Sequence, residues 1–392
     1  MSKSKYLFIS RKSSHFRYYK KLVAFLGAEA ELAQLKGFAW PRFTHMDRVN
    51  KLDINDLVDV HMCRKEVRHP ILKKNKLLNR WVRRFYEFRE RARASYYFSF
   101  FEFHPCETVI MWNGMKQPNR TPYVVAKATG KKTQLFENGL LPDTTTLDAN
   151  GVNAFNSVPR DPEFYRNWQG EVKPEEKKLV ARAAHKQRKT SDKVIELPER
   201  YVFVPFQVPN DTQVVCHSPW VCSMESFYTA LETALIELKQ EPKWREFKFV
   251  IKEHPSWPRS FCELHDKNPD IIFANDNNTQ DLIENALAVI TLNSTVGIES
   301  LLLSKSVITL GNAFFNIDGL VHHCPNQQKL NGILLNIEQQ QVDLNLVHRF
   351  LCYLKTEYLL PQSWSNITDE QEHFNAVKQR LIHPYYGSSQ GR

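Results

Sequence analysis

Short apolar runs alternate with helical stretches along this chain, and they do so in two separate series. The first series predicts strands and helices in turn at 5–10, 16–27, 108–113, 122–132 and 133–139. The second predicts strands at 201–208, 247–255, 270–276 and 288–293, with helices near 223–240, 279–287 and 294–305. Strand, helix and strand in close succession are typical of parallel βαβ units. The pattern therefore predicts an α/β protein with two doubly wound domains that face a cleft.

The stretch between the two series sets the predicted domain boundary. Residues 140–170 are rich in Pro, Gly, Asn, Asp and Thr without periodicity, and such a segment is more often functional than idle. Residues 171–199 are highly charged and are expected to hold one solvated helix and a linker. We expect a first domain at 1–195 with a catalytic loop and a second at 196–392, whose last helix is free to cross back to the first.

Charge is divided unevenly between the two halves. The 392-residue chain carries 53 Lys and Arg against 43 Asp and Glu, a net charge of +10. Residues 1–200 hold 39 basic and 22 acidic side chains, whereas residues 201–392 hold 14 and 21. The first half (+17) is therefore expected to meet an anionic partner, and the second half (−7) is not.

Several classes of protein are disfavoured by what the sequence lacks. It has no run of 18 apolar residues that could span a membrane, and its first residues do not resemble a signal peptide. Its seven cysteines are scattered without a C-x-x-C pair, which disfavours a disulfide framework and a thiolate zinc site. The expected location is the cytoplasm.

A basic amphipathic segment stands out at 72–93. It contains nine Lys and Arg but two Glu, and its apolar side chains recur at helical spacing. One interpretation is docking on an anionic membrane surface through Arg80, Trp81, Arg83 and Arg84. The other is a helix packed on its own sheet with solvated charges. Because no DNA- or RNA-binding motif accompanies the charge, nucleic acid is the least favoured partner.

Four short segments lie where predicted strands end, which is where α/β proteins place catalytic loops. In the first, at 136–165, Glu137 ends a strand and Asn138-Gly139 marks an abrupt turn. A carboxylate held at a strand end can act as a nucleophile or a base. The structural alternative is a turn carboxylate that caps main-chain N–H groups.

The second and third segments favour ligand binding of two kinds. Gln207 and Asp211 lie in a strand-to-helix loop whose polar side chains suit a polyhydroxylated ligand, although ordinary turns show the same residues. Lys252 and His254 follow a buried strand and can hold a phosphate, while Pro255 fixes the loop. A histidine that caps a nearby helix fits the third segment equally well.

The fourth segment, at 291–300, has the outline of an anion site. A buried strand leads into Asn293, Ser294 and Thr295 and then into a helix, although a plain helix cap gives the same pattern. The glycines of a Walker loop or a dinucleotide fingerprint are missing, which disfavours an ATPase or an NAD enzyme. A carboxylate on one domain and a phosphate cradle on the other predict transfer of a group from a nucleotide-activated donor.

The four segments also carry a family resemblance. ENGLLPDTTTLDANGVNAFNSVPRDPEFY, QVPNDTQV, KEHP and NSTVGIESLLLSKSVITLGNAFFNIDGL resemble the bacterial capsule polysaccharide biosynthesis proteins of the KpsS/LipB type, which are β-Kdo glycosyltransferases. The similarity covers roughly 135 to 320 in order and with similar spacing, and the terminal PYYG resembles the family's ending. Four ordered motifs are far more specific than any one alone.

The resemblance implies a GT-B fold of two Rossmann-like domains and a particular reaction. The donor would be CMP-β-Kdo, and the acceptor a phosphatidylglycerol-type lipid or a Kdo chain on it. Transfer with retention implies double displacement on an enzyme carboxylate. No metal or other cofactor is expected. The resemblance places at the CMP moiety Lys252, His254, Ser294, Thr295, Asn293 and Glu299, with Gln207, Asp211 and Pro255 completing the donor site.

One departure from the family pattern affects the catalytic assignment. Related Kdo transferases have an acidic residue in the middle of the E-x-G motif, and Asn138 occupies that position here. An amide cannot replace a carboxylate as nucleophile or base. We therefore expect Glu137 to be catalytic, with Asp148 as the second candidate and Asp161 in reserve. Substrate contacts are expected from Asn138, Asn153 and Arg160.

Other interpretations stay open at this stage. The donor could be another CMP-activated sugar acid such as sialic acid, or the chain could be a non-catalytic glycan- or lipid-binding subunit of the capsule export assembly. His15, Arg17 and the turn at 112–114 are acceptor-side candidates by position alone. If the leading interpretation is right, the protein lies on the inner face of the cytoplasmic membrane, with other capsule synthesis and export proteins as further partners.

Overall fold

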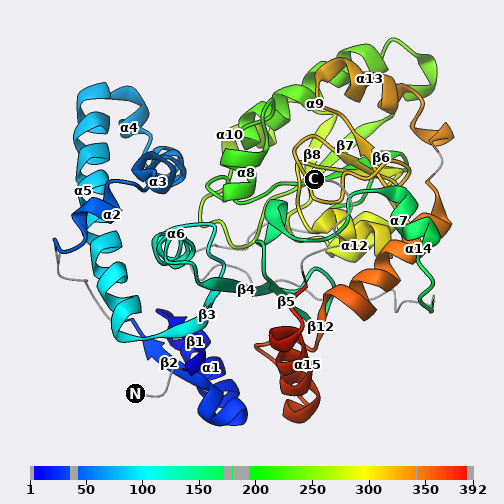
Figure 1. Cartoon of the computed structure of the whole chain (residues 1–392). Coiled ribbons are helices and arrows are strands. Elements are labelled where there is room, and N and C mark those ends of the chain that lie inside the picture. Colours follow the sequence, from blue (N-terminus) through cyan, green and yellow to red (C-terminus); the bar gives the residue numbers. More distant parts are fainter. Residues whose placement is uncertain (1–3, 36–42, 172–178, 180–193, 341, 386–392) are drawn as a thin grey trace. The chain divides into compact units, whose positions relative to one another are not determined.

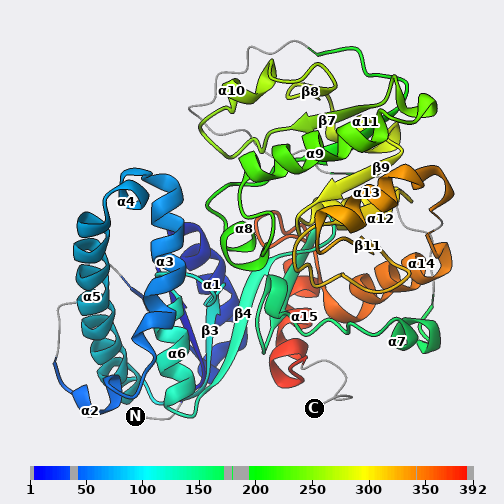
Figure 2. The same cartoon turned by 90° about the horizontal axis from the view of Figure 1, so that it is seen from above.

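The computed structural model describes residues 4–35, 43–171, 179, 194–340 and 342–385, and it divides into two compact units (Figures 1 and 2). Unit 1 consists of Met1–Pro159 and Glu357–Arg392, and unit 2 of Arg160–Thr356. The structural division thus follows Pro159, not residue 195 as the sequence suggested. The end of the chain returns to unit 1, where it adds a strand and a helix.

Unit 1 is built on a six-stranded sheet with the strand order β12-β5-β4-β3-β1-β2. β1 pairs in parallel with β2 and β3, and β3 with β4, whereas β5 is antiparallel to both of its neighbours. The strands are β1 (Ser4–Ser10), β2 (Ala30–Gln34), β3 (Cys106–Trp112), β4 (Lys132–Asn138), β5 (Thr144–Asp148) and β12 (Leu360–Pro361).

Helices cover both faces of this sheet. One core contains apolar side chains of α3, α5 and α6, and the other those of α1 and α15. Alternate residues of β1 divide between the cores, with Leu7 and Ile9 in the first and Tyr6 and Phe8 in the second. The helices of unit 1 are α1 (Ser13–Leu26), α2 (Met46–Val49), α3 (Ile54–Arg68), α4 (Ile71–Lys74), α5 (Lys76–Phe103), α6 (Arg120–Ala128) and α15 (Glu370–Ile382).

The predicted basic segment 72–93 is not one helix: its first residues lie in α4, which ends at Lys74, and the rest lie in the 28-residue helix α5, which begins after the cap residue Asn75. The Asn75 side chain accepts a hydrogen bond from the Leu78 N–H at 3.0 Å. The second half of α5 packs against the sheet, whereas the first half exposes large apolar side chains. No helix in the described ranges is long and apolar enough to span a membrane.

Unit 2 contains a second six-stranded sheet, ordered β11-β10-β9-β6-β7-β8, in which all neighbouring strands are parallel. Its strands are β6 (Tyr201–Pro205), β7 (Lys248–Lys252), β8 (Ile271–Phe273), β9 (Ala288–Thr291), β10 (Val307–Thr309) and β11 (His322–His323). Its helices are α7 (Pro162–Asn167), α8 (Thr212–His217), α9 (Met224–Leu238), α10 (Cys262–His265), α11 (Thr279–Glu284), α12 (Val296–Leu302), α13 (Gln327–Leu335) and α14 (Leu344–Tyr353).

The two sheets confirm the predicted α/β class with two Rossmann-like units. No regular element was predicted inside 140–170, where the structure has β5 and α7. β5 escapes a periodicity search because it is short and rich in threonine. Most of the charged stretch 171–199, including the helix expected there, lies outside the described residues.

Candidate active site

The carboxyl edge of the sheet in unit 1 has a topological switch point. From β1 the chain moves to β2 on one side, and β3 then lies on the other side of β1. Ligands of doubly wound proteins bind outside such a point. Because β1, β3 and β4 are parallel, the residues that follow them, together with Glu137 near the end of β4, come to this same edge.

Glu137 is half-buried, and two donors orient its carboxylate. Its Oε2 accepts a hydrogen bond of 2.6 Å from Nδ2 of Asn113, and its Oε1 accepts one of 3.0 Å from the N–H of Asn138. Asn113 is buried and has a left-handed backbone, with φ of 56°. Non-glycine residues in this conformation are uncommon and cluster at functional sites. The contact therefore fixes an accessible carboxylate from two sides.

The turn after Glu137 also explains why glycine follows Asn138. A Cβ atom on Gly139 would lie 1.9 Å from the Thr144 hydroxyl, so only glycine fits the tight connection between β4 and β5. Thr146 on β5 is the register partner of Glu137. The E-x-G motif is thus a hairpin that ends β4 and leaves Glu137 at the edge of the sheet.

An aromatic cluster borders this carboxylate. The His15 ring stacks on Trp112 with 4.0 Å between centroids, and Trp364 meets both rings edge-on at 4.9 and 4.6 Å. Trp364 donates its indole N–H to Oδ1 of Asn138 at 2.8 Å. Asn138, which replaces the acidic residue of the family pattern, is therefore the anchor of a tryptophan. Of the three rings, those of His15 and Trp112 are buried, and that of Trp364 is partly exposed.

Trp364 is the functional candidate that sequence reasoning missed. It lies 226 residues after Asn138, in the segment that returns to unit 1. No local motif marks it, because its significance depends on β12 pairing with β5. His15 and Trp112, which were candidates by position alone, lie in the cluster. Burial, with a smaller effect of Lys12, lowers the pKa of His15 to about 4. At neutral pH this imidazole is uncharged.

Asp148 does not fit the catalytic role that the sequence allowed. It is fully buried and accepts hydrogen bonds of 2.8 Å from Ser157 Oγ, 2.7 Å from the Ser157 N–H and 2.8 Å from Tyr358 Oη. The N–H groups of Asn150 and Gly151 complete its shell. A carboxylate with its lone pairs occupied in this way organises the loop after β5 and joins it to the C-terminal segment.

The other residues of the first motif are spread apart. Asn153 adopts a left-handed backbone in the loop after β5, with φ of 57°. Arg160 belongs to unit 2, where its exposed guanidinium lies over the ring of Phe314 at 5.4 Å. Asp161 caps α7 by accepting the Glu163 N–H at 3.0 Å. None of these observations joins the three residues to Glu137.

Unit 2 has its own switch point, between β6 and β9, and Gln207 and Asn293 lie there. Gln207 donates to Oδ1 of Asn293 at 3.1 Å and accepts from the Asn293 N–H at 3.2 Å. The Asn293 amide donates to the carbonyl oxygens of Gln213 and His217 at 2.8 and 3.1 Å. Both side chains are buried, so they hold loops together and do not present free amides to a ligand.

In the third motif, the side chains of Lys252 and His254 lie at the carboxyl end of β7. Lys252 donates to the carbonyl oxygen of Asn277, and His254 accepts the Ser256 N–H at 3.1 Å through Nδ1. Both side chains and Pro255 are partly exposed. Glu253, which the sequence did not single out, is buried and fixes the following loop by accepting from the Phe261 N–H at 2.8 Å and pairing with His265.

In the fourth motif, the local hydrogen bonds are those of a plain helix cap, the alternative to an anion site. Ser294 Oγ accepts the Val296 N–H at 3.2 Å, and Thr295 is the cap residue of the seven-residue helix α12. Glu299 lies in the first turn of that helix and is partly exposed. Asp211 similarly caps α8 by accepting the Gln213 N–H at 3.0 Å. The described residues contain no group of three His, Cys, Asp or Glu side chains placed to hold a metal ion.

The predicted membrane-contact residues lie on the first half of α5. Trp81 is 71% exposed, and Leu77 and Phe85 are exposed on the same helix. Arg80 and Arg84 are exposed, and within the described parts of the chain neither has an ion pair. Arg83 differs, because it pairs with Asp59 and with Glu87 at 3.2 Å.

Comparison with known proteins places the chain among capsule-related sequences. Residues 167–360 match the family model described as "Capsule polysaccharide biosynthesis protein". Protein FixF of Sinorhizobium fredii is 36% identical over 320 residues, covering 80% of this chain and 75% of FixF. Capsule polysaccharide export protein KpsS of Escherichia coli is 26% identical over 276 residues, covering 55% of this chain and 70% of KpsS.

A solved structure is similar over nearly the full length. Thermosulfurimonas dismutans KpsC, described as a beta Kdo 2,7 transferase, aligns with a TM-score of 0.48 and 11% sequence identity. The alignment covers 97% of this chain and 99% of that chain.

Proposed function

Because this chain belongs to the family of capsule polysaccharide biosynthesis proteins, we propose that it is a GT-B glycosyltransferase that moves Kdo from CMP-β-Kdo to a lipid acceptor. The acceptor would be a phosphatidylglycerol-type lipid or a Kdo chain already on it. The observation that carries the proposal is Glu137, a partly exposed carboxylate oriented by Asn113 at a switch point and bordered by aromatic rings. This combination suits chemistry at a sugar ring.

The proposed reaction is a double displacement with retention. An oxygen of Glu137 attacks the anomeric carbon of Kdo, and the bond from that carbon to the phosphate oxygen breaks with its electron pair leaving on CMP. The acceptor hydroxyl then attacks the same carbon, displaces Glu137 and gives its proton to the released phosphate or to water. The bonds from Asn113 and from the Asn138 N–H hold the carboxylate in one orientation during both steps.

Donor binding is proposed for the carboxyl edge of unit 2. Lys252 and His254 would face the CMP phosphate, where a positive charge and an N–H donor stabilise the leaving group. Ser294, Thr295 and Glu299 would line the nucleotide, with Asp211 and Pro255 shaping neighbouring loops. Gln207 and Asn293 serve this site as positioning residues, because their amides already bind one another and the loops. We expect catalysis without a metal or other cofactor.

The test supplies CMP-Kdo and a synthetic phosphatidylglycerol acceptor to the purified chain. We expect CMP release and a product heavier than the acceptor by one or more Kdo residues, with the β configuration, as measured by mass spectrometry and NMR. Competition with CMP-sialic acid tests the alternative that another CMP-activated sugar acid is the donor. Absence of CMP release with either donor would contradict an enzymatic role and favour a glycan- or lipid-binding subunit.

The first half of α5 is proposed to rest on the inner face of the cytoplasmic membrane. Exposed Trp81 and Phe85 would enter the headgroup region, and unpaired Arg80 and Arg84 would face anionic lipid. In a vesicle sedimentation assay, Arg80→Gln with Arg84→Gln should weaken binding to anionic vesicles roughly thirtyfold, at about 1 kcal/mol for each of the two cations.

The matched control for this surface is Arg83→Gln, whose charge is already neutralised by Asp59 and Glu87. Arg83→Gln should change vesicle binding much less than substitution of Arg80 or Arg84. None of these substitutions should alter CMP binding. Equal effects of all three would contradict an oriented contact. Other capsule synthesis and export proteins remain predicted partners.

A further inference from the structure

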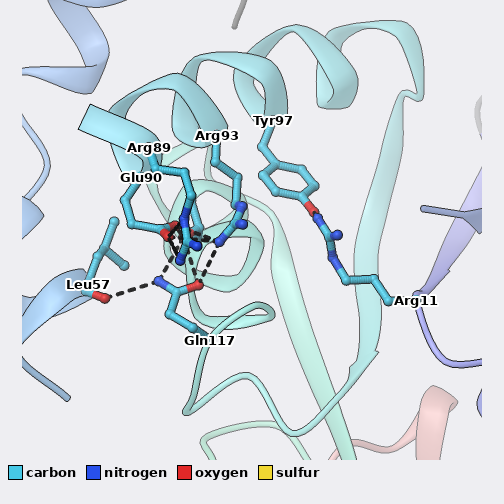
Figure 3. A network of polar contacts seen from close by, with 8 residues as sticks. Arg11, Leu57, Arg89, Glu90, Arg93, Tyr97 and Gln117 are labelled. Atoms are coloured by element: carbon cyan, nitrogen blue, oxygen red, sulfur yellow. Dashed lines mark hydrogen bonds and ion pairs between the residues drawn. The ribbon is translucent and has the colours of Figure 1, made fainter. Parts of the chain in front are cut away.

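Two guanidinium groups of α5 bond to one carboxylate, and a third, from the end of β1, bonds to a tyrosine further along the same helix. Arg89 and Arg93 bond to buried Glu90 on the same helix, at 3.0 and 2.8 Å. Arg11, which directly follows β1, donates to the hydroxyl of Tyr97 at 2.8 Å (Figure 3). We call Arg11, Arg89 and Arg93 the arginine cluster.

The carboxylate of Glu90 is saturated by its own contacts. Arg93 Nη1 reaches both of its oxygens at 2.8 and 2.9 Å, and Thr121 Oγ1 donates to Oε2 at 2.6 Å. Gln117 accepts a further bond from Arg93 at 3.3 Å and donates to the Leu57 carbonyl oxygen (Figure 3). The one negative charge of Glu90 is therefore taken up by Arg89 and Arg93, whereas Arg11 bonds elsewhere, to Tyr97.

Arg11 is the member whose charge is not matched. Within the described part of the chain, the hydroxyl of Tyr97 is the hydrogen-bond partner of its guanidinium, and that group is neutral. Its Nε is buried without a partner, and so is Oγ of Ser14, three residues further along. Buried donors without partners are uncommon in folded proteins and call for a ligand, ion or water.

The position of Arg11 is also that of a binding site. It lies at the switch point between β1 and β3, directly before the 14-residue helix α1. The start of α1 has no side-chain cap and no acidic residue in its first turn, so its N–H groups are open to an anion. Arg11 lies close enough to Arg93 to affect it: burial lowers the pKa of Arg93 most, Glu90 raises it, and Arg89 and Arg11 lower it further.

We propose that the arginine cluster, through Arg11 above all, binds a phosphate ester. The unmatched charge of Arg11, with its Nε unpartnered among the described residues, suits an oxygen of a phosphate ester. The first turn of α1 adds main-chain donors. That this phosphate ester is part of the acceptor rests on the proposed function, whereas the anion site itself does not.

The decisive comparison is between Arg11→Gln and Tyr97→Phe. Arg11→Gln removes the charge, whereas Tyr97→Phe removes the same hydrogen bond and keeps the charge. Isothermal titration of the full chain with glycerol 3-phosphate, at fixed ionic strength, should show at least a tenfold loss of affinity in Arg11→Gln. Tyr97→Phe should stay within threefold of the wild type. Arg11→Lys should recover part of the affinity.

The outcomes separate the possible explanations. Equal weakening in Arg11→Gln and Tyr97→Phe would mean that the pair is only structural, and acetate binding as tightly as glycerol 3-phosphate would remove the phosphate assignment. No measurable binding by the wild type would also overturn the proposal. Melting temperatures of the variants identify any loss caused by unfolding.

Two further arms identify the source of the phosphate. Phosphatidylglycerol presented in bicelles should compete with glycerol 3-phosphate if the lipid headgroup is the ligand, whereas competition by inorganic phosphate alone indicates a free phosphate. CMP-Kdo turnover is measured separately. Binding without turnover would refute the proposed function and keep the site, and turnover with equal acceptor KM in wild type and Arg11→Gln would refute the site's role.

Discussion

The carboxyl edges of the two sheets differ in what their polar side chains do. In unit 2, the amides of Gln207 and Asn293 bind each other and the neighbouring loops, and both are buried. In unit 1, Glu137 is held from two sides yet stays partly exposed. Unit 1 thus offers an oriented and partly exposed carboxylate, as the proposed function requires, whereas the two amides of unit 2 hold loops in place.

The same contrast separates two carboxylates within unit 1. Asp148 is saturated and buried, so it should contribute to stability, whereas Glu137 should contribute to chemistry. Asp148→Ala leaves the Ser157 N–H and the Tyr358 hydroxyl without a partner, and we expect a loss of at least about 3 kcal/mol in the free energy of unfolding. Urea denaturation measures this change.

The control for that measurement is Glu137→Gln, which should stay within about 0.5 kcal/mol of the wild type because the group is partly solvated. If the two variants were equally stable, Asp148 would not be the organiser of the loop after β5.

Substitutions of Asn138 test whether its amide affects the transfer reaction by holding Trp364 in place. Asn138→Asp keeps an acceptor for the indole N–H, so transfer should continue at close to the wild-type rate. Asn138→Leu frees Trp364 and should raise the acceptor KM by about tenfold, equivalent to about 1.4 kcal/mol, with little change in kcat. Steady-state kinetics with varied acceptor separates the two parameters. A fall in kcat for both variants would instead place Asn138 in the chemical step.

His15 should have a smaller effect, on how the free energy of unfolding depends on pH. Its pKa is lowered to about 4 in the folded state from an ordinary value of 6.5, so the unfolded chain binds the proton more readily between these values. Stability is therefore full above pH 6.5 and falls as the pH drops toward 4. We expect a loss of about 1 kcal/mol in the free energy of unfolding over this window.

The measurement is a comparison of unfolding free energies for wild type and His15→Gln at pH 7 and pH 4.5. The wild type should lose more stability than the variant. An identical loss of stability in both proteins would show that His15 is not held neutral by the aromatic cluster.

How far the sequence predicts this molecule depends on whether a feature is local. The position of Glu137 and the strands β1, β3, β4, β6, β7, β8 and β9 follow from apolar runs that end in polar turns, and these were predictable. The short strands β2, β5, β11 and β12 were not predicted. Trp364 and the saturation of Asp148 were not, because both depend on the return of the C-terminal segment to unit 1. The scaffold role of Asn293 was hidden for a similar reason, since its partners Gln213 and His217 are about 80 residues away.

The central claim is that the Glu137 carboxylate is the nucleophile, and a covalent intermediate tests it most directly. Wild-type protein incubated with CMP-Kdo but no acceptor is analysed by intact-protein and peptide mass spectrometry. We predict an added Kdo on the peptide that contains Glu137, and at least about a thousandfold loss of turnover in Glu137→Gln with CMP binding retained. A Kdo adduct on another residue, or normal turnover in Glu137→Gln, would contradict the account.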